Sequence, residues 1–339
     1  MAPRLSDIAD KVGFSEATVS RVLNGKSGVS TVTRNAVLSA VDMLGYARPA
    51  QLRTERVRLV GLVLPELQSP IFPAFAEVVA GALAQQGFTP VLCTRTEGGI
   101  TEPEYVDMLI AQQVSGVVFA GGLYAQADAP HDHYERLAER NLPVVLVNAA
   151  VDSLPFATVA CDDTTAAEQA LNHLVSLGHT RIGMVLGPPD HIPSQRKLSA
   201  ARRMAGGARI SLPDDHIARA DYSVEGGQAA AADLLRCGVT GVICASDPLA
   251  LGVIQAARRA GLSVPADVSV VGYDDSRFMR YTDPALTTVR QPIEAMGRAV
   301  VERLVAQING RNDFGGRLLF EPELIVRAST GPAPPGDTA

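Results

Sequence analysis

The sequence predicts a multi-domain protein in which a small all-α head precedes a larger α/β body. With 339 residues, 47% of them hydrophobic, the chain can bury more than one core. Residues 1–58 hold nine Lys or Arg against five acidic residues, which gives a charge of +4. Since the whole chain has a net charge of −6, the remaining residues carry −10. From about residue 57 onward, short apolar runs alternate with amphipathic stretches, which is typical of parallel sheets covered by helices.

The head is predicted to form three short helices. The first has an apolar face behind Ser6, a suitable N-cap, and ends at Gly13, which tolerates a left-handed C-cap. Ser15 caps the second helix and Ser30 the third, which ends before Gly45. The inward-facing residues of the three helices are Leu5, Ile8, Ala9 and Val12, then Val19, Val22 and Leu23, then Val37, Leu38, Val41 and Leu44. A small residue at Ala9 and a flexible corner at Gly13 give the first two the pattern of a helix-turn-helix.

Residues 5–24, LSDIADKVGFSEATVSRVLN, resemble the signature of the lactose/galactose-repressor (LacI/GalR) family of bacterial transcriptional regulators. The resemblance continues through Val29-Ser30, Thr33-Arg34 and Leu44-Gly45-Tyr46. It implies that residues 1–46 are a DNA-binding domain, with its motif at 5–24, and that residues 47–58 are a hinge to the body. A basic head on an acidic body suits a protein whose head alone meets phosphates.

The resemblance also implies which head residues touch DNA. Positions that hydrogen-bond phosphates in the family are occupied here by Ser15, Thr18, Ser20, Asn24, Ser30, Thr33 and Tyr46, and Leu5 belongs to the same DNA-binding set. Glu16, Ala17 and Arg21 are expected to face base edges in the major groove. Two alternatives stay open: Ser15 and Ser30 act only as helix caps, and Glu16 only favours the positive end of a helix dipole.

In the hinge, Leu52 is the candidate for a minor-groove wedge of the kind the family uses. The stretch from Tyr46 to Gly61 is about three residues, roughly one helical turn, shorter than is usual in the family. The alternative is that Leu52 packs back against Leu44 and Tyr46.

Seven strands are predicted in the body, and no G-x-G-x-x-G or Walker sequence follows any of them. They are Leu59–Leu64, Pro90–Cys93, Gly116–Phe119, Val144–Val147, Ile182–Leu186, Gly241–Cys244 and Val268–Val271.

Four body segments resemble the family's effector-binding core, which is similar to periplasmic sugar-binding proteins. They are Leu177–His179, Ala245–Asp247, Ser269–Asp275 and Leu286–Gln291. The resemblance implies a periplasmic-binding-protein-like effector domain at 59–330, with two lobes and a ligand cleft between them. Lobe 1 is expected at about 59–158 plus 289–321 and lobe 2 at about 159–288 plus 322–330, followed by a disordered tail at 331–339.

The effector pocket that the resemblance implies consists of Ile71, Phe72, Asn148, Gln195, Arg196, Lys197, Tyr222, Ser246, Asp247 and Asp274. Asp274 would accept from two hydroxyls, Arg196 or Lys197 would donate, and Phe72 and Tyr222 would offer flat apolar faces to a sugar ring. Two positions depart from the family: Lys197 stands where arginine is common and Ser246 where asparagine is common. Alternatively, Asp247 before Pro248 caps a helix, and Phe72 belongs to a lobe core or a dimer face.

Other classes of site and function are disfavoured. Cys93, Cys161, Cys237 and Cys244 lack metal-ligand or redox spacing and are expected to be reduced, buried thiols. His131 and His133 are expected in a solvated loop and not at a metal site. No catalytic arrangement stands out, so an enzyme is not expected, and no metal or cofactor is implied. The chain shows no signal-peptide core and no apolar run long enough for a membrane span, so a transport-type binding protein is disfavoured and a cytoplasmic location is expected.

The sequence therefore predicts a sequence-specific transcriptional regulator, in particular a repressor controlled by a small-molecule effector that is a sugar or sugar derivative. The tail lacks apolar heptads that would join two dimers, so we expect a homodimer on a pseudo-palindromic operator. The alternative is an activator or catabolite regulator whose co-signal is another protein.

Overall fold

The computed structural model describes residues 5–23, 29–30, 32–33, 36–37, 40–41, 58–96, 98–149, 151–206, 210, 212–311 and 316–337. The chain divides into two compact units, Met1–Arg58 and Leu59–Ala339. This division falls at the junction between the predicted hinge and the predicted body.

The described part of the head contains two helices where the sequence predicts them, α1 (Leu5–Val12) and α2 (Glu16–Leu23). Gly13 connects them with a φ of 70°, a value that favours glycine. The expected cap at Ser6 is wrong, because α1 begins at Leu5 and so includes Ser6. Residues 32–33, 36–37 and 40–41 are helical, as expected for the third helix. The buried apolar residues of all three segments form one core: Ile8, Ala9, Val19, Val22, Leu23, Val37, Ala40 and Val41.

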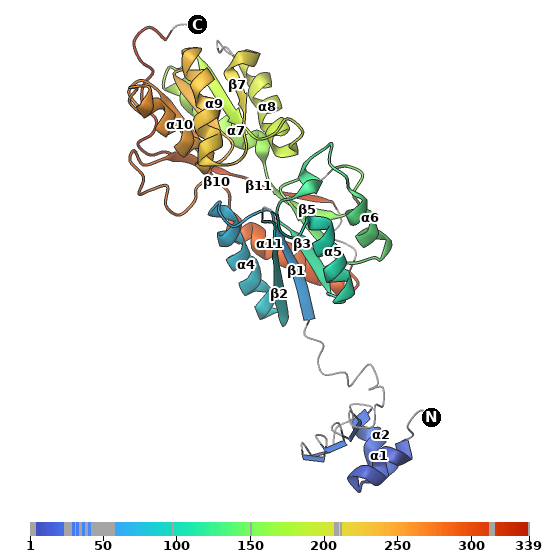
Figure 1. The fold of residues 1–339 in the computed structure, drawn as a ribbon. Coiled ribbons are helices and arrows are strands. Elements are labelled where there is room, and N and C mark those ends of the chain that lie inside the picture. The colour runs from blue at the N-terminus through green and yellow to red at the C-terminus, as the bar shows by residue number, and fades with distance from the viewer. Residues whose placement is uncertain are drawn as a thin grey trace. The chain divides into compact units, whose positions relative to one another are not determined.

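The first lobe of the body is built on a sheet whose described strands have the order β11-β5-β4-β3-β1-β2 (Figure 1). Their bounds are β1 (Arg58–Leu64), β2 (Phe88–Thr94), β3 (Gly116–Phe119), β4 (Val144–Val147), β5 (Ala157–Cys161) and β11 (Arg317–Phe320). Every residue of β3, β4 and β5 is buried. Burial on both faces is why β3 and β4 read as continuous apolar runs, whereas β5, which contains Thr158, was not among the predicted strands.

Helices cover both faces of the first sheet. Helices α4 (Ile71–Gln85) and α11 (Ile293–Ile308) contribute to the core on one face. Helices α5 (Glu102–Ala111) and α6 (Asp132–Glu139) contribute to the core on the other. A short 3-10 turn, η1 (Leu123–Ala125), follows β3.

The second lobe has a sheet with the order β12-β10-β9-β8-β6-β7. Its strands are β6 (Ile182–Leu186), β7 (Ile217–Arg219), β8 (Gly241–Cys244), β9 (Ser269–Asp274), β10 (Thr287–Arg290) and β12 (Glu323–Ile325). Strand β12 runs antiparallel to β10, whereas β6 to β10 pair in parallel.

Among the described residues, four helices accompany the second sheet, with a 3-10 turn, η2 (Asp214–His216), before β7. The helices are α7 (Asp163–Ser176), α8 (Ile192–Ala205), α9 (Val224–Arg236) and α10 (Asp247–Arg259). Helices α9 and α10 cross closely because two glycines lie at their contact. A Cβ on Gly227 would lie 2.3 Å from the Leu249 carbonyl oxygen, and one on Gly252 would lie 2.2 Å from the Val224 carbonyl oxygen.

In the described residues the chain passes between the lobes three times: from β5 to α7, from β10 to α11 and from β11 to β12 (Figure 1). The expected lobe boundaries at 158 and 288 fall inside β5 and β10, so they are corrected to the ends of those strands. A parallel strand belongs to one sheet along its whole length, and the chain changes lobe only where the strand ends.

The expected disordered tail is a further correction, because residues 331–337 are ordered against the second lobe. The backbone N–H of Ala333 donates to the Leu177 carbonyl over 2.8 Å. The Asp337 carboxylate is buried and accepts from the Thr180 hydroxyl over 2.8 Å and from Arg181 Nε over 3.1 Å. The Thr240 hydroxyl donates to it as well. A Pro- and Gly-rich composition that suggests disorder is offset here by one carboxylate that satisfies several donors at once.

The cysteines are all free, but the expectation that all four are buried is wrong for one of them. Cys237 is exposed, because it follows the last residue of α9 at the helix C-cap. Burial raises the pKa of Cys93 and of Cys161 to about 11 and raises that of Cys244 further. Within the described ranges, no helix is long and apolar enough to cross a membrane.

Replacing Asp337 by Ala should lower the free energy of unfolding by about 1–3 kcal/mol, because its donors lose their acceptor. Burial alone would raise the pKa of Asp337, but the hydrogen bonds from Thr240, Thr180 and Arg181 outweigh it and hold the pKa below the ordinary value. The stabilisation is therefore complete above the ordinary pKa and is lost as the pH falls below about 4. Urea unfolding at pH 7 and at acid pH tests this, with exposed Asp215→Ala as the control. Equal stability of wild type and Asp337→Ala at pH 7 would contradict it.

Candidate functional site

A cavity of about 470 Å³ lies between the two lobes of the body. In the first lobe its wall is formed by residues that follow β1, β3 and β4, such as Glu66, Gly121 and Asn148. In the second lobe it is formed by residues at the ends of β8 and β9, such as Ser246 and Asp274. The carboxyl ends of parallel strands are where open α/β sheets generally bind ligands.

Seven of the ten predicted effector residues line this cavity: Ile71, Phe72, Asn148, Lys197, Tyr222, Ser246 and Asp274. The other three, Gln195, Arg196 and Asp247, do not. On α8, Pro193 and Lys197 are four residues apart and face the cavity together, which turns Gln195 and Arg196 to another side of the helix. Phe72 both lines the cavity and packs against the first lobe's core, so its two proposed placements are compatible.

Asp274 ends β9 and is buried at the cavity wall. The Gln291 side-chain amide donates to its Oδ1 over 2.7 Å. Burial, and then the nearby Asp247, raise the pKa of Asp274 well above its usual range. Its φ of 117° is rare for a residue with a side chain, and such strain concentrates at functional sites.

Asp247 lies beneath the cavity wall and neither contacts the cavity nor caps α10. The cap is Ser246, whose hydroxyl accepts from the Leu249 N–H. The buried Asp247 carboxylate instead accepts from the Thr288 hydroxyl over 2.6 Å and from the Ser276 N–H over 2.7 Å. Burial raises its pKa to about 7 against the lowering effect of these hydrogen bonds. Asp247 thus ties α10 to the loop after β9 and to strand β10.

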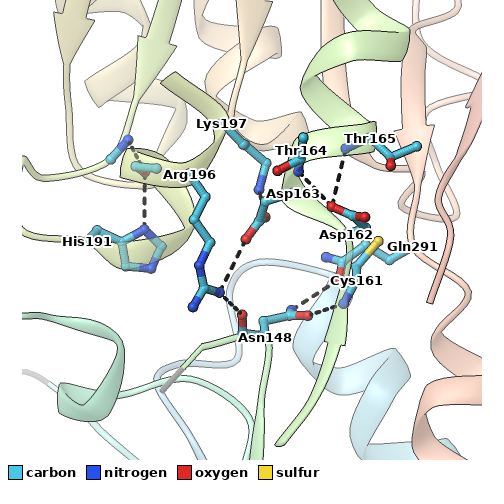
Figure 2. A network of polar contacts seen from close by, with 12 residues as sticks. Asn148, Cys161, Asp162, Asp163, Thr164, Thr165, His191, Arg196, Lys197 and Gln291 are labelled. Carbon is cyan, nitrogen blue, oxygen red and sulfur yellow. Dashed lines mark hydrogen bonds and ion pairs between the residues drawn. The ribbon is translucent and has the colours of Figure 1, made fainter. Parts of the chain in front are cut away.

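Lys197 reaches the cavity with its charge already paired. Its ammonium group contacts the Asp163 carboxylate at the start of α7, as Figure 2 shows. It also lies 4.0 Å from the centre of the Tyr273 ring, where a cation is attracted to the π face. Its capacity to donate to a ligand, which the sequence analysis expected, is therefore shared with Asp163.

Asn148 joins the segments that connect the lobes (Figure 2). Its Nδ2 donates to Gln291 Oε1 over 3.1 Å, and its Oδ1 accepts from the Cys161 N–H over 3.1 Å. Its carbonyl accepts from Arg196 over 3.2 Å, so Arg196 acts across the lobes and not on the cavity. The φ of Asn148 is 68°. Through Gln291, this inter-lobe cluster of Asn148, Gln291, Cys161 and Arg196 is continuous with Asp274.

A second polar cluster on the second-lobe side involves His191, Ser194 and Tyr222. The Tyr222 hydroxyl lies 2.9 Å from Ser194 Oγ and 3.0 Å from His191 Nδ1, and Ser194 Oγ lies 3.1 Å from the same nitrogen. Burial, and then the nearby Lys197 and Arg219, lower the pKa of His191 to about 3, so the ring is neutral at physiological pH. The cluster fixes the Tyr222 ring at the cavity wall.

The expected solvated loop at His131 and His133 is wrong. His133 is buried in the first turn of α6, and its Nε2 lies 2.9 Å from the carboxylate of Glu102. The Tyr134 hydroxyl donates to the same carboxylate. His131 Nε2 lies 3.0 Å from the Leu123 carbonyl oxygen. Across the part of the chain that the structure describes, no group of three His, Cys, Asp or Glu side chains could hold a metal ion.

In the head, α2 carries the residues predicted to face DNA bases. Glu16, Ala17 and Arg21 are exposed on it, whereas Val19, Val22 and Leu23 are buried. The remaining predicted DNA residues are Ser15 and Ser30, which are exposed, and Leu5, Thr18, Ser20 and Thr33, which are half-buried. Asn24, Tyr46 and Leu52 lie outside the described residues.

The hydroxyls of Ser15 and Ser30 accept from the N–H of Thr18 and Thr33 over 3.2 and 3.1 Å. Both serines therefore do cap their helices, and this leaves a DNA contact by their exposed hydroxyls open.

Among the cavity residues that were not predicted, three are polar residues that belong to the clusters described above, namely Asp163, Gln291 and His191. Asp163 lies two residues after β5, which was not among the predicted strands, and the family resemblance that supplied Asp274 did not supply Asp163. Gln291 directly follows β10 and was quoted only as part of a family segment. His191 precedes α8 without any apolar strand directly before it, so no local signal marks it.

Comparison with known proteins gives two family-model matches. The model of the bacterial regulatory proteins of the lacI family matches residues 4–49, and that of the periplasmic binding protein-like domain matches residues 171–330. The HTH-type transcriptional regulator reg1 of Streptomyces lividans is 50% identical over an alignment of 339 positions that covers 98% of each chain.

Two solved structures are similar over nearly the whole chain. A complex of the transcriptional regulator CelR with cellobiose has a TM-score of 0.73 and 32% identity, covering 96% of this chain and 99% of that one. The lac repressor dimer bound to operator and the anti-inducer ONPF has a TM-score of 0.74 and 27% identity, covering 98% of this chain and all of that one.

Asp274→Asn should change how stability depends on pH. A carboxyl whose pKa is raised by folding destabilises the folded chain increasingly as the pH rises from about 4 toward the folded pKa. Asparagine keeps the acceptor for Gln291 without the charge, so the variant should be at least as stable as wild type at pH 8. As the pH is lowered, the free energy of unfolding of wild type should rise relative to that of the variant, by at most about 1.4 kcal/mol per pH unit.

Chemical denaturation from pH 5 to 8 measures this. The matched control is Asp221→Asn, at an exposed residue of the same cavity, which should leave the pH slope unchanged. Parallel pH profiles for wild type and Asp274→Asn would show that the folded chain does not bury a costly charge there.

Proposed function

This chain belongs to the lacI family of bacterial regulatory proteins, and on that premise we propose that it is a repressor whose affinity for operator DNA is controlled by a sugar or sugar derivative bound between its lobes. It is a transcriptional regulator and not an enzyme. The observation that carries the effector proposal is the hydrogen-bonded path from Asp274 in the cavity, through Gln291, to Asn148 beside the segments that connect the lobes.

DNA recognition is assigned to the head. Exposed Arg21 on α2 is suited to donate to base edges, and Ser15 and Ser30 present hydroxyls near helix starts, where phosphates are commonly held. A two-fold homodimer would place two such heads on a pseudo-palindromic operator, in the cytoplasm where that DNA is found. The similar lac repressor was solved as a dimer on operator, which supports this assembly.

The response to the effector is assigned to the inter-lobe cluster at Asn148 and Gln291. A sugar hydroxyl that donates to Asp274 competes with the amide of Gln291, and Gln291 also accepts from Asn148. An effector therefore favours one arrangement of these side chains over another, and by doing so it favours one relative orientation of the lobes. The chain from the head enters the body at β1, so the first lobe is the one that passes a reorientation to the head.

Operator binding should weaken steeply with salt, because the basic head displaces counterions from phosphates. Arg21→Ala should cost about 1–3 kcal/mol on the cognate operator if its guanidinium reads a base. Lys11→Ala, at an exposed position of α1, also removes one positive charge from the head. It is the matched control and is expected to have the smaller effect. Gel-shift titrations measure both, and equal losses for the two variants would remove Arg21 from the base-reading residues.

Gln291→Leu should uncouple the two sites. It removes the hydrogen bonds to Asp274 and Asn148, so operator affinity without effector should stay close to wild type while the change caused by effector falls toward none. Calorimetric titration of an effector found by a thermal-shift sugar screen, with and without operator, gives the coupling from both directions. Gln195→Leu, on an exposed side of α8, is the control. Undiminished coupling in Gln291→Leu would show that the signal takes another path.

A further inference from the structure

A second cavity, of about 440 Å³, shares no lining residue with the cleft that holds Asp274. Its first-lobe side is formed by Val151 and Asp152, which lie between β4 and β5. Its second-lobe side is formed by Thr164 on α7 and by one face of α8. The residues on this face recur every three or four positions and are Ile192, Gln195, Arg196, Ser199 and Arg203. The second cavity therefore lies at the junction of the lobes, on a different side of α8 from the cleft.

Positive charge predominates at the second cavity. Arg196 and Arg203 line it, against one acidic residue, Asp152. Arg203 is exposed, and within the described ranges it has no ion-pair partner. Burial, and then the nearby Arg317, lower the pKa of Arg196, and Asp163 and Asp152 oppose this only in part. Among these residues the positive charges exceed the negative ones, even when the Lys197 partner of Asp163 is left out of the count.

Arg196 has donors left for a ligand. Its Nη1 donates to the Asn148 carbonyl over 3.2 Å and lies 3.8 Å from Asp163 Oδ2, as Figure 2 shows. Asp163 is shared with Lys197, so it compensates Arg196 only in part. A guanidinium carries five N–H donors, and among the described residues no group accepts from Nε or Nη2 of Arg196. These two nitrogens can therefore bind an anion while Nη1 keeps its contact with Asn148.

The groups at the second cavity are suited to a phosphate. The planar fork of an arginine matches two phosphate oxygens, and a dianion neutralises two cations at once. The hydroxyls of Thr164 and Ser199 belong to the same lining and can donate to further oxygens. Val151 and Ile192 add apolar surface, which can contact the organic part of a phosphate monoester. The chemistry of the second cavity thus differs from that of the cleft, where acidic residues predominate.

We propose that the second cavity is a regulatory site for a small phosphate monoester, with the phosphate held by Arg196 and Arg203. This proposal does not depend on what the cleft binds. A phosphate at this site reduces the repulsion between Arg196 of the second lobe and Arg317 of the first, so it favours the lobe arrangement in which these two cations are close. Because the chain from the head enters the first lobe at β1, such a bias changes operator affinity.

Binding is measured by calorimetric titration of the full-length chain with glycerol 3-phosphate, inorganic phosphate and acetate at constant ionic strength. Glycerol 3-phosphate should bind more tightly than inorganic phosphate and at least about tenfold more tightly than acetate. Arg203→Ala should weaken glycerol 3-phosphate binding at least about tenfold. Asp152→Asn, which removes the acid from the lining, should strengthen it about two- to fivefold. Arg202→Ala is the matched control, because Arg202 pairs with Asp214 and does not line the cavity.

Gel-shift titrations with operator test the regulatory part, at the same ionic strength because operator affinity depends on salt. Saturating glycerol 3-phosphate should change the operator affinity of wild type at least about fivefold. Arg203→Ala should keep the operator affinity of wild type without ligand and lose the change caused by ligand. Arg202→Ala should keep both.

Four results would overturn the proposal. Undiminished binding of glycerol 3-phosphate by Arg203→Ala would remove the site. Binding that is lost in Arg95→Ala, which removes an exposed cation of the cleft, would place the anion in the cleft instead. Acetate or inorganic phosphate that binds as tightly as glycerol 3-phosphate would contradict the ligand class. Tight binding of glycerol 3-phosphate with unchanged operator affinity would contradict the regulatory role.

Discussion

The body depends on one hydrogen-bonded path that starts at a buried carboxyl. Asp274 accepts from Gln291, and Gln291 accepts from Asn148. The Asn148 side chain accepts from the backbone of Cys161, where β5 leaves the first lobe. The members of this path stand at strand ends in both lobes, where the chain passes from one lobe to the other. A ligand that changes the partners of Asp274 therefore changes a contact on which the relation of the two lobes rests.

The cleft is also a place where buried charge is managed by pairing. Lys197 is neutralised by Asp163, and the Asp247 carboxylate is satisfied by Thr288 and Ser276. Asp274 has the Gln291 amide but no cation of its own at hydrogen-bond distance, so burial and Asp247 raise its pKa. Desolvated groups of this kind gain most from a ligand that supplies donors, because an unmet buried acceptor costs about 1–3 kcal/mol. The geometry of the cleft thus favours a hydroxyl-rich ligand.

Backbone geometry holds this arrangement in place. Asn148 and Asp274 both have positive φ, and each lies at the end of a buried parallel strand whose sheet fixes its position. At the far side of the second lobe, the tail is held by Asp337 against Thr180 and Arg181, which covers the ends of that sheet away from the cleft. The strained residues at the cleft are supported by rigid sheets, as strain at a functional site requires.

The sequence alone determined the head and the order of the body. The apolar spacing of α1 and α2, the glycine between them and the buried runs of β1, β3, β4, β6 and β8 are local signals, since each depends on residues close together in the chain. Short or edge strands such as β7, β11 and β12, which are only half-buried, lack a continuous apolar run and could not be seen. Asp274, the last residue of β9, was identified through the family resemblance, and the segment Ser269–Asp275 that carries the resemblance is also a local signal.

Only the tertiary structure decided which side chains meet. Arg196 and Lys197 are adjacent in the sequence, yet they lie on different sides of helix α8. Arg196 donates to the Asn148 carbonyl in the other lobe, whereas Lys197 pairs with Asp163 in the cleft. Asp247 looked like a helix cap until its partners, Thr288 and Ser276, were seen to come from distant segments. The tail residue Asp337 lies in a Pro- and Gly-rich segment of the sequence, yet its carboxylate is buried in the structure. Each of these outcomes depends on contacts between residues far apart in the chain, and local composition carries no information about such contacts.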